Sequence, residues 1–179
     1  MAEMVHPINK PEEILDIVDI NDNVIGEAPI SEANTNPNII HREVAIIIYD
    51  DKNRLLLQKR DRRKRIDPGF WALTAGHVPK GMKPHDAAHM ELMEELGFDT
   101  GLTFVEKTLQ ARTNEKRFFY WYKCRFPENT KVKLEEGQVE KITFLPESGL
   151  KKFLGSGEKI EPLTLKFIKR FWAGRGGQN

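Results

Sequence analysis

Cysteine is almost absent from the sequence. Its 179 residues contain one, Cys124. No internal disulfide can therefore form, and the strand-like run FFYWYKCRF around this residue indicates a buried free thiol. Long apolar runs are missing as well, because no stretch approaches the roughly 20 residues of a membrane span and the first residues lack the apolar segment of a secretory signal. We therefore expect a cytoplasmic protein that is neither exported nor anchored.

An excess of charge of either sign is also missing. Lys and Arg together number 28 and Asp and Glu number 27, for a formal net charge of +1. A balanced chain has no global attraction to nucleic acid or to an anionic membrane, so basic character must be local. The 39% of hydrophobic residues is enough for a real core, and the length fits one domain better than two.

Apolar runs separated by turn residues predict an α+β fold. Residues 14–30 are typical of two short strands around an Asn-Asp-Asn turn, and residues 42–60 of a second hairpin, whose run VAIII predicts a strand covered on both faces. Residues 31–38 are expected to form a loop. Further strands are predicted around residues 71–75, 102–113, 117–126 and 139–146, and further helices at 146–155 and 162–172. Because strands and helices do not alternate regularly, the pattern favours an α+β sandwich.

One predicted helix carries a dense group of carboxylates. In PKGMKPHDAAHMELMEELGF, the helix should begin near Pro84, which suits a first helical turn, and end at Gly97, which suits the position after a C-terminus. Positions three and four apart share a helical face, so Glu91, Glu94 and Glu95 converge. Taken alone, such a cluster is usually a solvated acidic face. Carboxylates held this closely also bind hard divalent cations, which can in turn hold the phosphates of a substrate.

The stretch that begins with the GHVPKG loop and ends after this helix resembles the Nudix box. The box is a glycine, five residues, a glutamate, seven residues, Arg-Glu, an aliphatic residue, any residue, Glu-Glu, any residue, a glycine and an aliphatic residue. The positions that match without a gap are Gly76, Glu91, Leu92, Glu94, Glu95 and Gly97, with Phe98 as an apolar equivalent. The resemblance implies a Nudix α/β/α sandwich with a mixed sheet. It also implies Mg²⁺ or Mn²⁺ held by Glu91, Glu94, Glu95 and the Gly76 carbonyl, with Glu94 and Glu91 acting in catalysis.

The same resemblance indicates how the chain is organised. Residues 41–179 correspond to the Nudix domain, and residues 1–40 form an N-terminal extension whose hairpin belongs to the same domain. The extra hairpin could supply the surface of a homodimer.

Two positions depart from the box. Met82 stands where the pattern has its first glutamate, and Met90 stands where it has arginine; in the family these charges are thought to support the loop and helix. Replacing only one of the two charged residues would leave the other as a partly buried charge without a partner. Replacing both with apolar residues avoids that penalty. We interpret the pair as a compensated replacement, with methionine filling the remaining gap. The alternative is a catalytically impaired domain that only binds a nucleotide or another phosphorylated ligand.

The segment before the box resembles isopentenyl-diphosphate isomerases and their hydrolase-like relatives. The matching residues are His41, Arg60, Pro68, Gly69, Phe70 and Trp71. The isomerases carry an essential cysteine just before their Gly-His pair, where this chain has Ala75, so isomerase chemistry is disfavoured. His77 matches an isomerase histidine that joins a metal site, although Asn34 lies near the place of a further histidine ligand. His77 is therefore either a ligand or a structural loop histidine.

A basic run follows the second hairpin, and acidic residues outside the box complete the predicted site. The run consists of Arg60, Arg62, Arg63, Lys64 and Arg65. Guanidinium groups bind phosphate bidentately, so Arg60 and Arg65 are predicted to bind the substrate. No interleaved aromatic residues or recognition helix accompany the run, which disfavours nucleic acid as a partner.

The family often has a further glutamate outside the box, and Gln138 occupies that place here. Glu136, or Glu135 beside it, is therefore predicted to be the catalytic base or an extra ligand. Together the patterns predict a metal-dependent pyrophosphohydrolase. Its substrate would be a nucleoside diphosphate linked to another moiety, or a related small-molecule diphosphate, cleaved at a phosphoanhydride bond.

Overall fold

Strand β3 (Ile40–Tyr49) lies at the centre of a nine-stranded sheet in the computed structural model, which describes residues 12–64 and 66–172. It pairs in parallel with β8 (Lys116–Arg125) along its whole length and antiparallel with β6 (Thr74–His77). Nearly all of its side chains are buried, as the continuous apolar run predicts. The parallel and antiparallel pairs together confirm the mixed sheet.

The other elements follow closely the order that the sequence predicts. The strands are β1 (Ile14–Val18), β2 (Val24–Pro29), β4 (Leu55–Arg60), β5 (Trp71–Ala72), β7 (Thr103–Ala111) and β9 (Val139–Leu145). The helices are α1 (Ile30–Ala33), α2 (Pro84–Glu91), α3 (Leu150–Leu154) and α4 (Pro162–Phe167), with π-helical turns η1 (Leu92–Leu96) and η3 (Ile168–Trp172) and a 3₁₀ turn η2 (Glu147–Gly149). The expectation of a plain loop after β2 is wrong, because α1 forms there. A single helical turn is too short to leave a periodic pattern in the sequence.

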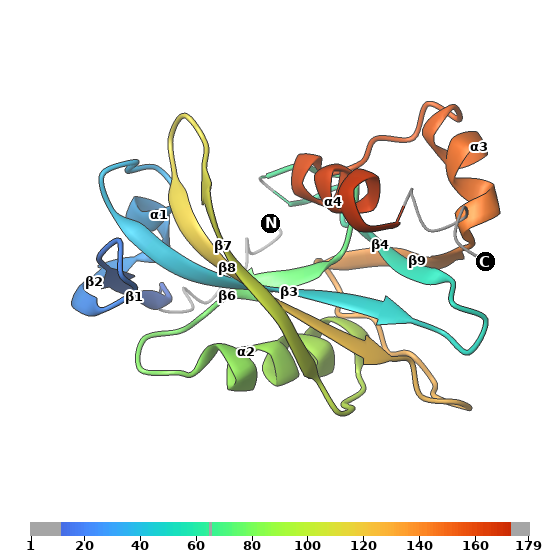
Figure 1. Cartoon of the computed structure of the whole chain (residues 1–179), viewed down its shortest axis with the longest axis horizontal. Coiled ribbons are helices and arrows are strands. Elements are labelled where there is room, and N and C mark those ends of the chain that lie inside the picture. Colours follow the sequence, from blue (N-terminus) through green and yellow to red (C-terminus); the bar gives the residue numbers. More distant parts are fainter. Residues whose placement is uncertain (1–11, 65, 173–179) are drawn as a thin grey trace, which may run out of the picture.

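Helices cover both faces of the sheet (Figure 1). Below it in this view lies α2, and above it lie α3 and α4. Alternate side chains of β3 point to opposite faces, so Val44, Ile46 and Ile48 share a buried cluster with α2 and η1, whereas Ala45 and Ile47 share one with α3, α4 and η3. The two clusters confirm the predicted α/β/α sandwich.

The N-terminal hairpin is fastened to the central sheet. Strands β1 and β2 pair antiparallel, and β1 joins β3 where Val18 lies opposite Ile40. Asp22, in the turn, has a positive φ of 70° and accepts hydrogen bonds from Arg42 at 2.7 Å and from Lys107 at 2.9 Å. The predicted hairpin is thereby confirmed, and it lies against the N-terminal end of β3.

Two composition-based expectations concern single features. Cys124 is a buried free thiol, as predicted, and burial raises its pKa to about 12. Among residues 12–64 and 66–172, no helix has the length and apolar character that crossing a membrane requires.

Candidate active site

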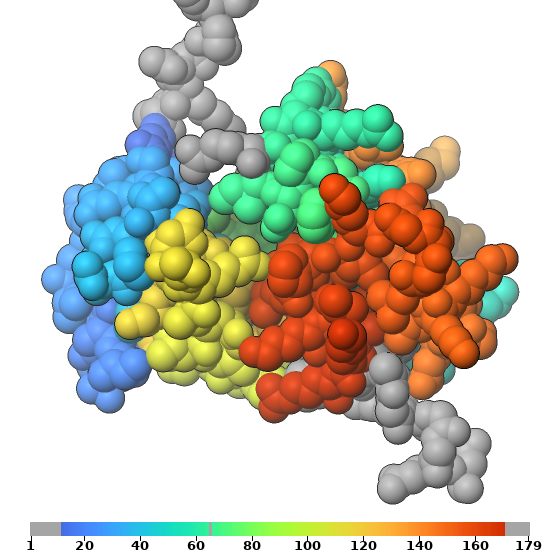
Figure 2. All heavy atoms as spheres, turned by 90° about the horizontal axis from the view of Figure 1, so that it is seen from above, coloured from blue at the N-terminus to red at the C-terminus, as the bar shows by residue number. Residues whose placement is uncertain are grey.

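A cavity of about 450 Å³ opens between the loop that joins β7 and β8, helix α4 and the loop after β4. Figure 2 shows this hollow from above, bordered by the yellow β7–β8 loop, red α4 and the green loop. Its volume lies within the roughly 300–1,000 Å³ of small-ligand pockets. Half of the residues that line it are Asp, Glu, Lys or Arg. The cavity is therefore suited to a polar, charged ligand.

The helix that carries the predicted metal ligands begins and ends as the sequence predicts. Pro84 is the first residue of α2, where its missing N–H costs no hydrogen bond, and Gly97 follows η1 with a left-handed φ of 73°. The last turn, η1, widens to a π-helix, a feature frequent at functional sites. Glu91, Glu94 and Glu95, called the box carboxylates from here on, all line the cavity.

Two of the box carboxylates are largely withdrawn from water. Glu95 is 5% exposed and accepts a hydrogen bond of 2.6 Å from Nε2 of Gln58. The side-chain oxygen of Gln58 in turn accepts a hydrogen bond from the hydroxyl group of Thr74. Burial raises the pKa of Glu95, and burial together with the charges of Glu95 and Glu94 raises the pKa of Glu91. A divalent cation would offset both the desolvation and the mutual repulsion, so the residues present fit such an ion.

Gly76 lies so close to Glu91 that no side chain fits between them. The glycine sits on β6 opposite Val44 of β3, and a Cβ on it would overlap the carboxylate of Glu91. Glycine thus allows the strand backbone to approach the carboxylate. Carboxylate and carbonyl oxygens are the ligands that Mg²⁺ and Mn²⁺ prefer.

The end of β4 and the basic loop after it each place one cation at the cavity. Arg60 and Lys64 line it, and burial together with the charge of Arg60 lowers the pKa of Lys64. Arg62 and Arg63 instead pair with carboxylates outside the cavity lining. Arg65 lies outside the described residues. Sequence reasoning singled out Arg60 but gave Lys64 no role of its own. Within a run of basic residues, the sequence does not show which side chains point into the cavity.

Of the two acidic residues that precede β9, one lines the cavity and the other is exposed to solvent. The side chain of Glu136 is 93% exposed and lies 3.8 Å from Arg63, whereas Glu135 and Gln138 line the cavity. Of the two glutamates weighed from the sequence, Glu135 is therefore the one placed to act on a ligand.

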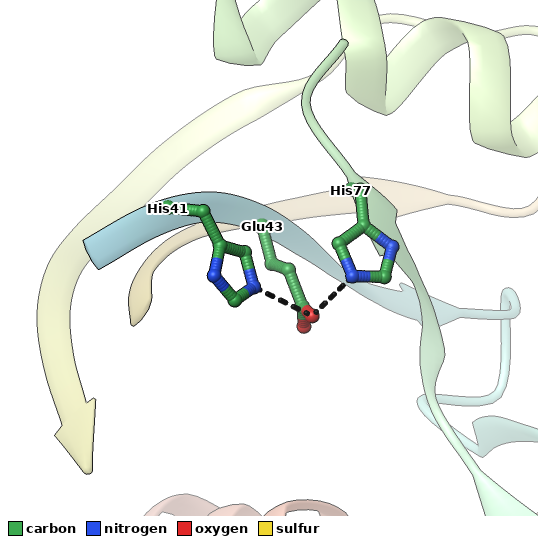
Figure 3. Close-up of side chains that lie close together, drawn as sticks. All are labelled: His41, Glu43 and His77. Atoms are coloured by element: carbon green, nitrogen blue, oxygen red, sulfur yellow. Dashed lines mark ion pairs between the residues drawn. The ribbon is translucent and has the colours of Figure 1, made fainter. Parts of the chain in front are cut away.

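His41, Glu43 and His77 form a compact group beside the cavity (Figure 3). His41 and Glu43 occupy alternate positions on β3 and His77 lies on β6, so that both Nε2 atoms face one oxygen of Glu43, at 3.6 and 3.2 Å. Within the described ranges, these three residues, and not the box carboxylates, are the group whose ligand atoms all lie within 4.8 Å of one another. Both ring nitrogens of His41 are buried without a hydrogen-bond partner. Imidazole and carboxylate groups in this arrangement can hold a transition metal.

Arg117 already provides a cation to this group. Its Nη1 donates to the same Glu43 oxygen at 2.5 Å, and its Nη2 lies 3.0 Å from Glu115. Burial alone would raise the pKa of Glu43, but the charges of Arg117 and His77 outweigh it and hold the pKa well below its usual range. Burial lowers the pKa of His77 to about 4, and its Nε2 also faces Asn34 Oδ1 at 3.1 Å. A metal ion here would compete with Arg117 for Glu43.

Sequence reasoning missed the charged residues that β3, the β7–β8 loop, β8 and the residue before α4 bring to the cavity. These are Glu43, Arg112, Glu115, Arg117 and Glu161. The available signal was a charge inside or next to a strand of otherwise apolar residues, because buried charges are rare unless they are paired or functional.

The family of the chain follows from comparison with known proteins. The NUDIX domain family model matches residues 39–164, which includes the cavity's central strands, the box and α4 up to Thr164. The chain belongs to the NUDIX domain family, as its resemblance to the box predicts. It is 27% identical over 146 residues to an uncharacterized Nudix hydrolase of Listeria monocytogenes, a match that covers 81% of this chain and 86% of that protein.

Two further relatives are isomerases. The chain is 37% identical over 92 residues to an isopentenyl-diphosphate Delta-isomerase of Nocardia farcinica, covering 51% of this chain and 53% of that one. It is 40% identical over 95 residues to isopentenyl-diphosphate Delta-isomerase 2 of Photorhabdus laumondii, covering 52% and 53%. The match thus spans about half the length of these isomerases.

Solved structures show the same fold. The protein DR0079 of Deinococcus radiodurans superposes with a TM-score of 0.74 at 18% identity, covering 89% of this chain and 99% of that one. A MutT protein from Methanosarcina mazei Go1 gives a TM-score of 0.62 at 22% identity, covering 76% and 94%. At these identities the likeness establishes the Nudix fold.

Proposed function

We propose that the protein is a divalent-metal-dependent hydrolase of a small-molecule diphosphate and cleaves its phosphoanhydride bond with water. The observation that carries the proposal is the meeting of the box carboxylates, Gly76 and the cations Lys64 and Arg60 in one cavity. The relatives include a Nudix hydrolase. The substrate would be a nucleoside diphosphate linked to another moiety or a related organic diphosphate.

The box carboxylates and the Gly76 carbonyl would hold Mg²⁺ or Mn²⁺. When bound, such an ion polarises a phosphoryl oxygen and lowers the pKa of a water molecule. Gln58 keeps Glu95 in place through its hydrogen bond of 2.6 Å, so that this carboxylate needs little reorganisation when the ligand arrives.

Three side chains outside the box would bind the substrate or accept a proton from the attacking water. Lys64 and Arg60 would bind and orient the phosphate oxygens through charge-assisted hydrogen bonds. Glu135 would accept the proton of the attacking water, and the leaving phosphate would depart with the electrons of the broken P–O bond. Arg65, which lies outside the described residues, stays a candidate for phosphate binding from its place in the basic run of the sequence.

Two other functions are favoured by particular observations. Met82 and Met90 favour a catalytically impaired domain that binds a nucleotide or phosphorylated ligand, and the complete set of box carboxylates opposes it. The isomerase relatives and the His41 group favour isopentenyl-diphosphate isomerisation, and Ala75, which lines the cavity where isomerases carry cysteine, opposes it. We expect no metal-dependent deuterium exchange from solvent into isopentenyl diphosphate.

A substrate panel tests the proposal. Diphosphate compounds are incubated with Mg²⁺ or Mn²⁺, and phosphate is measured after a phosphatase step. Glu94→Gln should lower kcat by about a hundredfold or more, an effect of the size expected for a group that stabilises charge in the transition state. Glu147→Gln is the matched control, because Glu147 is exposed on η2 outside the cavity lining. Phosphate release that Glu94→Gln leaves unchanged would contradict the proposed site.

A further inference from the structure

Two histidines on α2 lie one helical turn apart, outside the cavity. His85 and His89 have the i, i+4 spacing that places side chains on one face of a helix, and their ring centroids are 4.7 Å apart. Neither residue lines the cavity, and α2 lies on the opposite side of the sheet from α4, which borders the cavity (Figure 1). The proposed hydrolysis uses neither histidine.

Each ring is held in place from one side. The Nδ1 atom of His89 makes a hydrogen bond with Oδ1 of Asp99, and the same oxygen accepts the backbone N–H of Thr100 at 2.8 Å. The ring of His85 packs edge-on against that of Tyr122 on β8, with the two centroids 5.7 Å apart. The structure thus restrains both imidazoles before any ligand binds.

The second nitrogen of each ring is available to a ligand. The Nδ1 atom of His85 faces a carboxylate oxygen of Asp86 at 3.7 Å, too far for a direct hydrogen bond. Among the described residues, the Nε2 atoms of His85 and His89 have no hydrogen-bond partner. The side chain of His85 is 52% exposed and that of His89 is 28% exposed, so solvent reaches both. Two imidazole nitrogens one helical turn apart can therefore accept a common ligand.

This arrangement matches the way in which proteins hold transition-metal ions. Two histidines separated by three residues have a ligand spacing that is common at zinc sites. A histidine that binds a metal almost always gives its other ring N–H to a carboxylate or carbonyl group, which fixes the tautomer and the ring orientation. Asp99 makes that contact with His89. The carboxylates of Asp86 and Asp99 also supply negative charge beside the rings, which favours a cation.

Imidazole ligands select the kind of ion. Hard cations such as Mg²⁺ and Mn²⁺ prefer oxygen ligands, whereas imidazole nitrogen suits Zn²⁺, Cu²⁺ and Ni²⁺. We propose that His85 and His89 bind a divalent transition-metal ion of this second kind, with water completing its coordination. Asp99 is a positioning residue for His89. The ion joins neighbouring turns of α2 and stabilises the helix that carries the box carboxylates. The inference does not depend on the proposed function.

No lysine or arginine competes with a metal ion at this place. At the group formed by His41, Glu43 and His77, Arg117 already donates to the carboxylate, and an ion there would have to displace it. On α2 the situation differs, because within the described part of the chain the acidic partners of His85 and His89 make no ion pair with Lys or Arg. The pair on α2 can therefore accept a cation without breaking an arginine–carboxylate contact.

Zn²⁺ binding by the full chain, prepared without a histidine tag, tests the proposal. Calorimetry in Mg²⁺ compares the wild type with a His85→Gln, His89→Gln variant. The variant should lose one Zn²⁺ site or bind there at least about tenfold more weakly, since loss of a mere supporting partner already costs that much. Zn²⁺ should also raise the Tm of the wild type more than that of the variant, because a ligand bound only by the folded state stabilises it.

Two further variants separate this site from the other candidate metal sites. His41→Gln combined with His77→Gln is the matched control, because it removes the same number of imidazoles from the group beside the cavity. Replacement of all three box carboxylates with glutamine removes the oxygen ligands. Both variants should keep the Zn²⁺ site on α2 at wild-type affinity. If the first does not fold because His41 is fully buried, His77→Gln alone replaces it.

The role of Asp99 is tested by comparison with its neighbour. Asp99→Ala removes the partner of His89 Nδ1 and should weaken Zn²⁺ binding by about tenfold or more. Asp99→Asn keeps an acceptor oxygen and should restore part of the affinity. Asp86→Ala removes the same charge but no hydrogen bond, so it should weaken binding less. Equal losses in Asp86→Ala and Asp99→Ala would contradict a positioning role for Asp99.

The Zn²⁺ titrations decide the proposal whatever the result for hydrolysis. Loss of a site in the His85→Gln, His89→Gln variant, with the site kept in the other two variants, would support it. Unchanged Zn²⁺ binding in the His85→Gln, His89→Gln variant would overturn it, and so would a wild type that does not bind Zn²⁺. A loss confined to the His41→Gln, His77→Gln variant would place the ion beside the cavity and also overturn it.

Discussion

Groups that are absent at single positions shape this site as much as the charged groups do. Gly76 lacks the Cβ that would overlap Glu91, and Ala75 stands where the resemblance to isomerases implies a cysteine. Met82, half-buried, lacks the charge of the box glutamate and packs instead against the apolar cluster between α2 and the sheet. At this scale the chain has the carboxylates that are proposed to bind metal but lacks the charges of the box at Met82 and Met90.

A single methyl group at Gly76 should disable metal binding without unfolding the protein. Gly76→Ala pushes the carboxylate of Glu91 aside, and since a carboxylate is the end of a flexible side chain, the fold should survive. We expect about a tenfold or greater loss of Mn²⁺ affinity, comparable to the effect of disturbing a metal site's supporting residues. Gly26→Ala is the control, because a Cβ there meets nothing within 4 Å. Calorimetric titration measures both variants, and unchanged affinity in Gly76→Ala would count against Glu91 as a ligand.

The two methionines should behave as a coupled pair. Met90→Arg alone adds a partly buried cation without a partner, at a cost below the roughly 3–5 kcal/mol of a fully buried one. Adding Met82→Glu should recover part of that loss, with a favourable coupling of at least about 0.5 kcal/mol in denaturant melts. Strict additivity would mean that the two positions do not interact. An inactive wild type that becomes an efficient hydrolase as the double variant would favour the binding-only alternative.

At the scale of elements, local sequence determined what could be predicted. Pro84 and Gly97 mark the ends of the α2–η1 helix, and the apolar run of β3 indicates a doubly covered strand, because these signals lie within a few residues of each other. The contact of Gln58 with Glu95 and that of Arg117 with Glu43 join residues 37 and 74 positions apart. Such pairs depend on strand register, which one sequence does not specify.

The β1–β2 hairpin braces the loop that precedes α2. Lys80 N donates to Ile14 O at 2.9 Å, and Gly81 N donates to Asp16 Oδ2 at 2.9 Å. The loop therefore has support from outside the box, where Met82 replaces the usual charge. This contact between residues 65 positions apart was also beyond local patterns.

Removing the brace should loosen the loop. Asp16→Ala leaves the Gly81 N–H without its acceptor and should lower the free energy of unfolding by about 1 kcal/mol, with weaker Mn²⁺ binding. Asp16→Asn keeps an acceptor oxygen and should restore most of both. Urea melts and Mn²⁺ titration provide the two readouts. Equal loss in the two variants would show that the charge of Asp16, and not its hydrogen bond to the loop, matters.

Over the whole molecule the positive and negative charges nearly balance, but charged side chains are concentrated around the cavity. The box carboxylates are concentrated at the cavity, and Arg60, Lys64 and the ion pairs made by Arg112 and Arg117 adjoin them in its lining. The outer hairpin carries exposed Ile20, Val24 and Ile25, and a homodimer through this surface stays a prediction.

The buried carboxylates should make the metal-free protein less stable in alkali. The pKa of Glu91 and that of Glu95 are raised above the ordinary 4.5, so the folded state holds protons that the unfolded chain has released. The free energy of unfolding should therefore fall as pH rises. The lowered pKa of His77 works in the opposite direction, but only up to the ordinary 6.5. Between about pH 7 and 9 the decline should be visible in urea melts, and Mg²⁺ or a Glu91→Gln, Glu95→Gln variant should flatten it. Stability that rises over this range without metal would contradict the assignment.

The most direct test of the account is the location of the metal. Mn²⁺ binding is followed by electron paramagnetic resonance in the wild type, in a Glu91→Gln, Glu94→Gln, Glu95→Gln variant, and in a His41→Gln, His77→Gln variant. The account predicts that the glutamine triple variant loses Mn²⁺ binding and that the histidine variant keeps it, because hard cations prefer carboxylate oxygens. Wild-type Mn²⁺ binding in the triple variant, together with its loss in the histidine variant, would place the metal at His41, Glu43 and His77 and contradict the account.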